Sequence, residues 1–226
     1  MRILKSIVNI VLIFIIFICA YKILYKIAEY KKADDTYERI RIEKEEVNDA
    51  YIDNADYRGW IKVENTNIDY PILQGNDNEY YLDKDINKEY LASGSIFMNY
   101  LNNGFNDENT VLFGHNMRNG TMFGQLKKYK ESDFFYGNND IDIELSNGDN
   151  LKYKVFSVYI TNVEDNYIKT KFDNKDEYKD FLERIKNKSI YKSEVDLNED
   201  DKIITLSSCS YEFDDARIVV HGKLIN

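Results

Sequence analysis

Hydrophobic residues are concentrated at the N-terminus and alternate with polar residues over much of the remaining chain. Residues 6–21 form an almost wholly apolar run, SIVNIVLIFIIFICAY. A helix needs about 20 apolar residues to cross a hydrocarbon core of ~30 Å, and residues 23–25 prolong the run while Lys22 can extend its ammonium to the interface. The pattern therefore predicts a single transmembrane helix within an anchor of residues 1–25.

The flanks of this run favour an uncleaved anchor over a signal peptide. No small-x-small cleavage site follows it, and the bulky sequence KILYKIAEY comes directly after. Charge alone leaves the orientation open, because several lysines on the C-terminal side compete with Arg2 and Lys5 on the N-terminal side under the positive-inside rule.

Residues 26–57 are dense in charge and contain neither Gly nor Pro. Tyr37, Ile40, Val47 and Tyr51 recur there at helical spacings. This pattern predicts one or two helices between the membrane and the folded domain.

Gly59 ends the helical pattern, and short segments rich in β-branched and aromatic residues begin at Trp60. They predict a mainly β domain over residues 58–226. The segments are WIKVENTNIDYPILQ, GSIFMNY, NTVLFG, DIDIELSNGDNLKYKVFSVYITN and KIITLSS.

The clearest hairpin joins IDIEL to LKYKVFSVYI through the five-residue turn SNGDN. Its residues Ile141, Ile143 and Leu145 should face one side of the sheet. Pro71 is the only proline, and we expect it at a strand edge or start, where its missing N–H costs little.

One amphipathic helix is predicted between the strands, at residues 173–188. Its sequence places Tyr178, Phe181, Leu182 and Ile185 at i, i+3, i+4 and i+7. Such a stripe is typical of core packing rather than of a ligand surface.

The 226-residue chain has a formal net charge of -10. Nucleic acid is excluded as a partner, because phosphate binding needs a concentrated Lys/Arg surface and the charges here are interleaved. With two histidines and no Gly-rich phosphate loop, neither a metal nor a cofactor is expected. The two cysteines lie near opposite ends of the chain, so no disulfide framework is implied.

Cys209 ends the predicted strand KIITLSSC. Free cysteines are often simply buried, so a structural role stays open. A strand, turn and antiparallel strand would return Arg217 to Cys209, where a guanidinium can favour the thiolate and donate hydrogen bonds to an oxyanion. A salt bridge from Arg217 to Asp214 or Asp215 is the alternative.

A cysteine nucleophile also needs a proton acceptor and donor, and His115 and His221 are the two histidines. His221 lies four residues after Arg217 in one predicted strand, about 13 Å away on the same face. His115 follows the strand NTVLFG and precedes a polar loop, so it lies at a strand end, where sites commonly form. The spacing favours His115.

These motifs together resemble the sortases, a family of transpeptidases, and class B sortases most closely. The sequence TLSSC is followed eight residues later by Arg217, and NTVLFGHNM lies upstream. The segments GWIKVENTNIDYPILQGNDNEYYL, GSIFMNY and ARIVVHGKL, with the helix at 173–188, extend the resemblance over about residues 57–226. Ser208 stands where the family's TLxTC pattern has Thr.

The resemblance implies a closed or nearly closed eight-stranded β-barrel with peripheral helices. It implies Cys209 as the nucleophile, His115 as the general acid/base, and Arg217 as the group that stabilises the oxyanion or substrate carbonyl. Ser207 would line the substrate groove.

The resemblance also implies an activity. The enzyme would cleave a cell-wall sorting signal of the xPxTx type after Thr, hold the surface protein as a thioacyl intermediate, and transfer it to a peptidoglycan amine. The catalytic domain would then lie on the cell-wall side of a Gram-positive-type cell, tethered by its single-pass anchor.

Two other interpretations stay open. A papain-like or wall-peptide Cys-His hydrolase usually has its histidine well downstream of the cysteine, whereas His221 lies only twelve residues after Cys209. A membrane-anchored binding module would need no reactive Cys209, so thiol labelling separates it from an enzyme.

Overall fold

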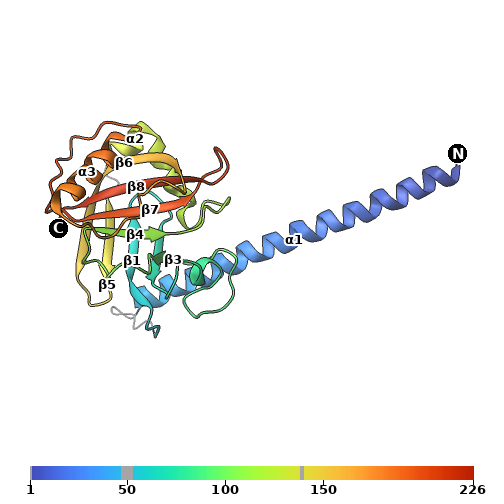
Figure 1. Cartoon of the computed structure of the whole chain (residues 1–226). Coiled ribbons are helices and arrows are strands. Elements are labelled where there is room, and N and C mark those ends of the chain that lie inside the picture. The colour runs from blue at the N-terminus through green and yellow to red at the C-terminus, as the bar shows by residue number, and fades with distance from the viewer. Residues whose placement is uncertain (1, 47–52, 138–139) are drawn as a thin grey trace.

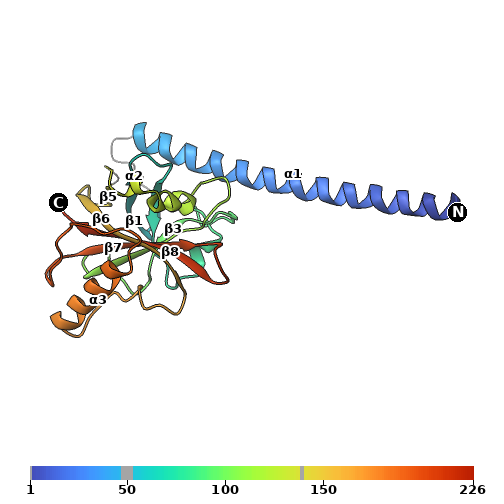
Figure 2. The same cartoon turned by 90° about the horizontal axis from the view of Figure 1, so that it is seen from above.

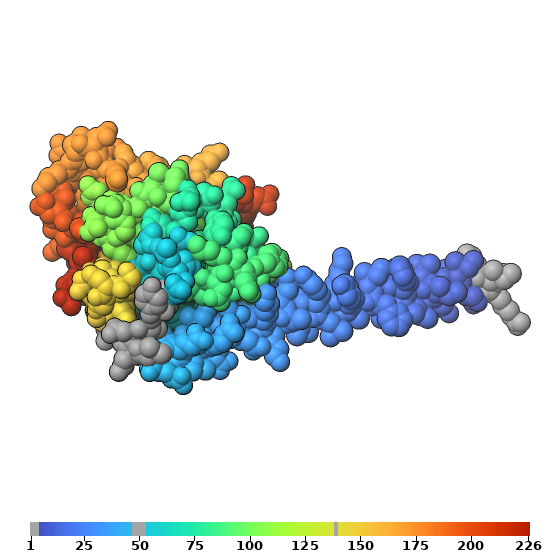
Figure 3. All heavy atoms as spheres, turned by 90° about the horizontal axis from the view of Figure 1, so that it is seen from below, coloured from blue at the N-terminus to red at the C-terminus, as the bar shows by residue number. Residues whose placement is uncertain are grey.

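The structure, a computed structural model, describes residues 2–46, 53–137 and 140–226. A closed β-barrel forms the body of the molecule, and one long helix extends from it (Figure 1). This helix, α1 (Arg2–Glu46), has 45 residues. Its second half lies against the barrel while its first half projects away (Figure 3).

Eight strands close the barrel in the order β1-β2-β3-β4-β7-β8-β6-β5. β2 pairs with β3, and β4 with β7, in parallel, whereas the other neighbours are antiparallel. The predicted closed eight-stranded barrel with peripheral helices is therefore confirmed. The strands are β1 (Tyr57–Val63), β2 (Asp69–Leu73), β3 (Ile96–Met98), β4 (Asn109–Phe113), β5 (Ile141–Leu145), β6 (Asn150–Asn162), β7 (Ile203–Cys209) and β8 (Ala216–Leu224). The shorter helices are η1 (Tyr80–Leu82), η2 (Phe123–Lys130), α2 (Ser132–Phe135) and α3 (Lys175–Asn187).

The β5–β6 hairpin confirms the prediction made from alternation and the Gly-containing turn, although β6 begins at Asn150, one residue earlier than expected. Ile141 and Ile143 are buried in the barrel interior, and Leu145 packs against the same core. Gly59 lies inside β1 and not before it. A Cβ there would come within 2.5 Å of the Glu144 carbonyl oxygen, so β5 approaches β1 closely at this point.

The expected position of Pro71 was wrong. It is the central residue of β2, paired with Trp60 of β1, and β2 lies between two other strands of the barrel. Pairing of β2 with β3 starts only at Ile72, so Pro71 faces no β3 partner. The barrel therefore tolerates a proline where one side of the ladder is not yet formed.

Helix α3 confirms the predicted amphipathic stripe. Asn174 caps its N-terminus by accepting a hydrogen bond from the Glu177 backbone N–H. The stripe contributes to a second hydrophobic cluster outside the barrel, with β6 and β8 residues such as Phe156 and Val219. Its four residues are all buried: Tyr178, Phe181, Leu182 and Ile185.

The second half of α1 is docked on the barrel through an apolar stripe. Ala33, Tyr37 and Ile40 are buried. The Tyr37 hydroxyl donates to the Gly94 carbonyl oxygen at 2.5 Å, and its ring meets Tyr70 edge-on at 5.1 Å. A buried aromatic pair with a satisfied hydroxyl fixes both the position and the rotation of the helix.

Cations on α1 strengthen this contact. Lys44 forms an ion pair with Glu144 and lies 5.2 Å from the Trp60 ring, and Arg41 lies 5.6 Å from the Tyr70 ring. One continuous helix thus covers residues 2–25 of the predicted anchor and residues 26–46 of the juxtamembrane segment. Residues 53–56, which were also predicted as helical, form an irregular segment that ends in a turn, and Tyr57 begins β1. Of the predicted helical stripe, Val47 and Tyr51 lie outside the described residues.

Within the described residues, one helix is long and apolar enough to cross a membrane by length and composition. Its most apolar window lies near the N-terminus, has a mean hydropathy of 2.7, and is 0% buried against the rest of the molecule.

His221 is fully buried on the outer face of the barrel, beside Phe156 and Tyr159 of the second hydrophobic cluster. It is 0% exposed, its Nε2 lies 3.0 Å from the Tyr159 hydroxyl, and its Nδ1 lies 2.8 Å from the Thr205 hydroxyl. Burial, with a smaller contribution from the charge of Arg184, lowers the pKa of His221 from 6.5 to about 3. Both ring nitrogens serve packing and hydrogen bonding inside the fold.

This buried histidine should make the barrel sensitive to acid. The unfolded chain takes up a proton on His221 below pH 6.5, whereas the folded chain does so only near pH 3. As the pH falls from 6.5 to 3, protonation of His221 in the unfolded chain should lower the free energy of unfolding by about 1.4 kcal/mol for each pH unit. Denaturant unfolding of the parent and of His221→Gln should therefore give stabilities that converge as the pH falls. A constant difference from pH 7 to pH 4 would contradict this assignment.

Candidate active site

The parallel pairing of β4 with β7 brings the ends of two strands together. Phe113 is the register partner of Ser207. His115 follows Phe113 by two residues, and Cys209 follows Ser207 by two residues. The same register therefore carries His115 and Cys209 to the same rim of the barrel, although they lie 94 positions apart in sequence.

Antiparallel pairing of β7 with β8 adds Arg217. Cys209 and Arg217 are direct register partners, and Cys209 is a partly exposed free thiol. The Arg217 guanidinium donates a hydrogen bond to the Ala216 carbonyl oxygen at 3.0 Å. Among the described residues it forms no ion pair, so the alternative salt bridge to Asp214 or Asp215 is not observed. Its remaining donors are available at the rim.

Backbone and hydroxyl hydrogen bonds fasten the His115 loop to the end of β7. The Gly114 N–H donates to the Ser207 carbonyl oxygen at 3.2 Å, and the Ser208 hydroxyl donates to the Gly114 carbonyl oxygen at 2.6 Å. A Cβ at Gly114 would lie 2.4 Å from Ile96 Cδ1. A larger residue here would have to displace the side chains of Ile96 and Phe123, so glycine lets the chain pass this close to the core. Ser208, in place of the family's Thr, therefore has a defined role in this junction.

Asn116 provides a second fastening that sequence reasoning did not predict. Its side-chain amide donates to the Cys209 carbonyl oxygen at 2.9 Å. The Tyr211 hydroxyl in turn donates to the Asn116 carbonyl oxygen at 3.1 Å. The segments that follow the histidine and the cysteine are thus tied across the site. The adjacency of Asn116 to His115 is the signal that could have pointed to it.

The imidazole of His115 has one fixed partner. Its Nε2 lies 2.7 Å from the Leu82 carbonyl oxygen at the end of η1. A carbonyl oxygen only accepts, so Nε2 carries the proton in this arrangement and Nδ1 is the basic nitrogen of the neutral ring. His115 is therefore arranged to take a proton at Nδ1, and the Leu82 contact sets its tautomer.

Ser207 is 2% exposed, and its hydroxyl lies 2.9 Å from the Tyr167 hydroxyl. Burial raises the pKa of Tyr167, while the Ser207 hydrogen bond and the Arg217 charge act in the opposite direction. The phenol therefore keeps its proton. This aromatic residue between β6 and α3 had no recognisable signal in the sequence.

The structure does not bring His221 into this site. Its register partner in β7 is Thr205, four residues before Cys209, and it is fully buried beside Phe156 and Tyr159. Within the residues that the structure describes, no group of three or more His, Cys, Asp and Glu side chains could hold a metal ion. The rim presents a thiol, an imidazole and a guanidinium.

Comparison with known proteins agrees with this arrangement. A family model for the sortase domain matches residues 61–225. The chain belongs to the sortase family. It is a cysteine transpeptidase of the sortase B type.

Individual relatives cover 80–97% of this sortase. Sortase B of Staphylococcus aureus is 36% identical over 235 aligned positions, which cover 97% of this chain and 96% of that one. The crystal structure of Clostridium perfringens sortase B is 47% identical with a TM-score of 0.75, covering 80% of this chain and 100% of that one. A Staphylococcus aureus sortase B–substrate complex is 33% identical with a TM-score of 0.79, covering 88% and 98%.

The roles of individual residues in this sortase stay predictions. Cys209, His115 and Arg217 lie together on one rim, formed by the ends of β4 and β7 and the start of β8. Ser207 lies two residues inward along β7, and its hydroxyl contacts Tyr167. The geometry thus separates three groups that can meet a substrate from one that is buried beneath them.

Asn116 should position Cys209 without taking part in the chemistry. A neutral hydrogen bond contributes about 0.5–1.5 kcal/mol, so Asn116→Ala should lower the transpeptidation rate by up to about tenfold. The rate of Cys209 alkylation should change with it, while the thermal unfolding temperature stays close to that of the parent.

Asn119→Ala is the matched control. Asn119 is exposed on the same loop, and its side chain accepts hydrogen bonds only from Thr121 among the residues described. Parent-like turnover and alkylation in Asn116→Ala would show that the contact with the Cys209 carbonyl has no positioning role.

Proposed function

We propose that this sortase is a membrane-anchored enzyme that attaches surface proteins to the cell wall. It cleaves an xPxTx-type sorting signal after Thr, holds the protein as a thioacyl intermediate on Cys209, and transfers it to an amine of peptidoglycan. The observation that carries the proposal is the position of Cys209, between the strand end that leads to His115 and its direct partner Arg217.

The first half of the reaction forms a thioester. The Cys209 thiolate attacks the carbonyl carbon of the Thr residue, and Arg217 donates hydrogen bonds to the oxyanion that develops. Collapse of this intermediate breaks the peptide bond, and the protonated His115 gives a proton to the leaving amine. The sorting signal's C-terminal fragment then departs, and the surface protein stays on Cys209.

The second half reverses these roles. An acceptor amine attacks the thioester while His115, now neutral, takes a proton from it. Arg217 again stabilises the oxyanion, and the thiolate leaves. A neutral imidazole with its proton on Nε2, as the Leu82 contact sets it, has the Nδ1 lone pair needed for this step.

The substrate groove is proposed to run beside Ser207. This residue and Tyr167 contact each other next to the rim and are both buried, so they would support the groove from beneath. The family resemblance and the related sortase B–substrate complex support a sorting-signal peptide as the ligand.

A papain-like hydrolase is disfavoured by His221. Such an enzyme needs its histidine downstream of the cysteine, and His221 is fully buried with both ring nitrogens engaged, by Tyr159 and by Thr205. A binding module without chemistry is disfavoured by the partial exposure of the Cys209 thiol beside Arg217, which has no carboxylate partner among the described residues.

Helix α1 is proposed as a single-pass anchor with the barrel on the cell-wall side. Its first half is apolar and exposed, and the barrel packs only on its second half. An extracellular barrel tethered at the membrane would meet secreted substrates as they leave the bilayer. The division into an anchor at residues 1–25, a helical segment at 26–57 and a catalytic domain at 58–226 is part of this proposal.

Incubation of the full chain in detergent with a small library of xPxTx peptides tests the reaction. We expect cleavage after Thr, a mass adduct on Cys209, and a new amide when an amine is added, because the thioester is open to aminolysis. Cys209→Ala and His115→Ala should each abolish cleavage.

The controls distinguish chemistry from folding. His221→Gln should keep most of the parent activity if it folds, because its role is structural. A folded and active His115→Ala would overturn the assignment of the general acid/base, and cleavage without any Cys209 adduct would overturn the thioacyl route.

Arg217→Lys should lower turnover by about a hundredfold, the usual effect of losing an oxyanion donor. An ammonium keeps the charge but cannot reproduce the planar fork of the guanidinium. The matched control is Arg39→Lys on the exposed face of α1, which should behave as the parent. Near-normal turnover of Arg217→Lys would reduce this residue to a structural one.

A further inference from the structure

The barrel begins where the apolar run of α1 ends. Side chains from Lys5 to Ala28 are exposed along the helix, and Ala33 is the first that is buried. A helix rises about 1.5 Å per residue, so Tyr25 and Ala33 are about 12 Å apart along the axis. The headgroup layer of a bilayer is roughly 5–8 Å thick on each side. If the apolar run of α1 spans the bilayer, the barrel therefore lies directly against the headgroups of the leaflet.

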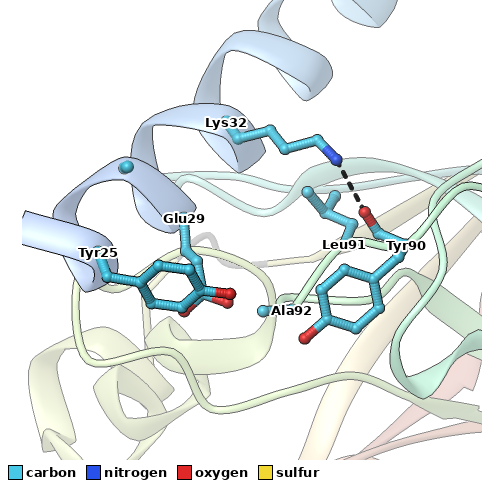
Figure 4. Close-up of a pocket in the computed structure, with 7 residues that line it drawn as sticks. Tyr25, Glu29, Lys32, Tyr90, Leu91 and Ala92 are labelled. Atoms are coloured by element: carbon cyan, nitrogen blue, oxygen red, sulfur yellow. Dashed lines mark hydrogen bonds between the residues drawn. The ribbon is translucent and has the colours of Figure 1, made fainter. Parts of the chain in front are cut away.

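A pocket of about 260 Å³ lies at this level, between α1 and the segment that leads from η1 to β3. The Lys32 ammonium donates to the Tyr90 carbonyl oxygen at 2.9 Å and closes one side of it. The rings of Tyr25 and Tyr90 point toward one another across the pocket (Figure 4). It is lined by Tyr25, Ala28, Glu29, Lys32, Tyr90, Leu91 and Ala92.

Three exposed tyrosines lie at the level of this pocket. Tyr21 and Tyr25 on α1 are 69% and 54% exposed, and Tyr90 on the barrel is 59% exposed. Tyrosine is enriched where hydrocarbon meets headgroup, because its ring is apolar and its hydroxyl is polar. Tyr90 therefore has the chemistry of an interfacial residue, although it belongs to the barrel and not to the helix.

Charges of both signs surround the pocket, and Lys32, which lines it, has no carboxylate partner among the described residues. Glu29 pairs with Lys26 at 3.0 Å, and Asp83 pairs with Lys84 at 2.9 Å. Glu89 is exposed nearby and would oppose binding to an anionic surface. The contact therefore fits the polar–apolar boundary of a phospholipid, and it does not depend on anionic lipid.

We propose that Tyr90 and the pocket beside it form a second membrane contact. Tyr90 lies in the headgroup region of the leaflet that α1 enters, and the pocket takes the glycerol region of a phospholipid. This inference rests on the proposed anchoring by α1 and adds a barrel surface to it.

Insertion of α1 and the contact at Tyr90 together fix the orientation of the barrel relative to the membrane, whereas insertion of α1 alone would let the barrel tilt. The clamp of α1 on the barrel transmits the helix direction to the strands. The β7–β8 hairpin lies at the end of the barrel toward the projecting half of α1, and the C-terminus lies at the opposite end (Figure 1 and Figure 2). The rim that carries Cys209 consequently faces the leaflet.

Fluorescence quenching by bromolipids tests the contact. The full chain is placed in phosphatidylcholine vesicles whose acyl chains carry bromine near the headgroup end, with Tyr90→Trp or with Ile225→Trp as the matched control. Ile225 is 53% exposed beside the C-terminus. The native Trp60 is 4% exposed and supplies the same background in every protein.

After this background is subtracted, the tryptophan introduced by Tyr90→Trp should emit at shorter wavelength in vesicles and lose most of its intensity to the bromolipids. The tryptophan introduced by Ile225→Trp should keep both its wavelength and its intensity, because the C-terminus lies at the far end of the barrel.

Flotation with the vesicles and resistance to carbonate extraction show that α1 is inserted in the membrane. If the inserted chains show equal quenching of the two introduced tryptophans, the Tyr90 contact is overturned and the anchor stands. If carbonate extracts the chain, both the contact and the anchor are overturned. Should Tyr90→Trp fail to fold, nitration of the parent chain gives the same answer. Tyr90 should be protected in vesicles relative to Tyr136, which is 62% exposed, and equal nitration would overturn the proposal.

Discussion

The parallel pairing of β4 with β7 is the constraint on which the site depends. Two parallel strands end at the same edge of a sheet, so residues far apart in sequence emerge side by side. Here the pairing continues beyond the strands, through the contacts of Gly114 with Ser207 and Ser208 and of Asn116 with Cys209. The loop that carries His115 is thereby fastened to the end of β7.

The antiparallel pairing of β7 with β8 brings together residues that are close in sequence. Arg217 reaches Cys209 through a short hairpin, so their proximity is local and needs no global fold. This explains which parts of the site the sequence could predict. The Cys209–Arg217 pair follows from strand, turn and strand, whereas spacing only favoured His115, and the family resemblance was needed to assign it. The contacts made by Asn116, Leu82 and Tyr167 depend on tertiary register, which no periodicity in the chain encodes.

In the fold, too, features set by nearby residues were predicted, whereas features set by a neighbouring strand were not. The β5–β6 hairpin and the stripe of α3 follow from alternation, turn chemistry and helical spacing, and both were predicted. Pro71 and Gly59 were misplaced because each owes its position to a neighbouring strand: Pro71 to the late start of β3, and Gly59 to the close approach of β5. Backbone sterics set by a partner strand cannot be read from the residues of one strand alone.

The uninterrupted helix α1 has a mechanical consequence for an enzyme held at a membrane. A flexible tether lets a domain sweep a volume that grows with tether length, and many heights are then sampled. A helix clamped by Tyr37 and Lys44 allows almost none of this freedom. The distance between the active site of such an enzyme and the membrane is set by the length of the helix. Under the proposed anchoring, each substrate would have to present its cleavage motif at that one distance, and lateral diffusion would replace reach as the means by which enzyme and substrate meet.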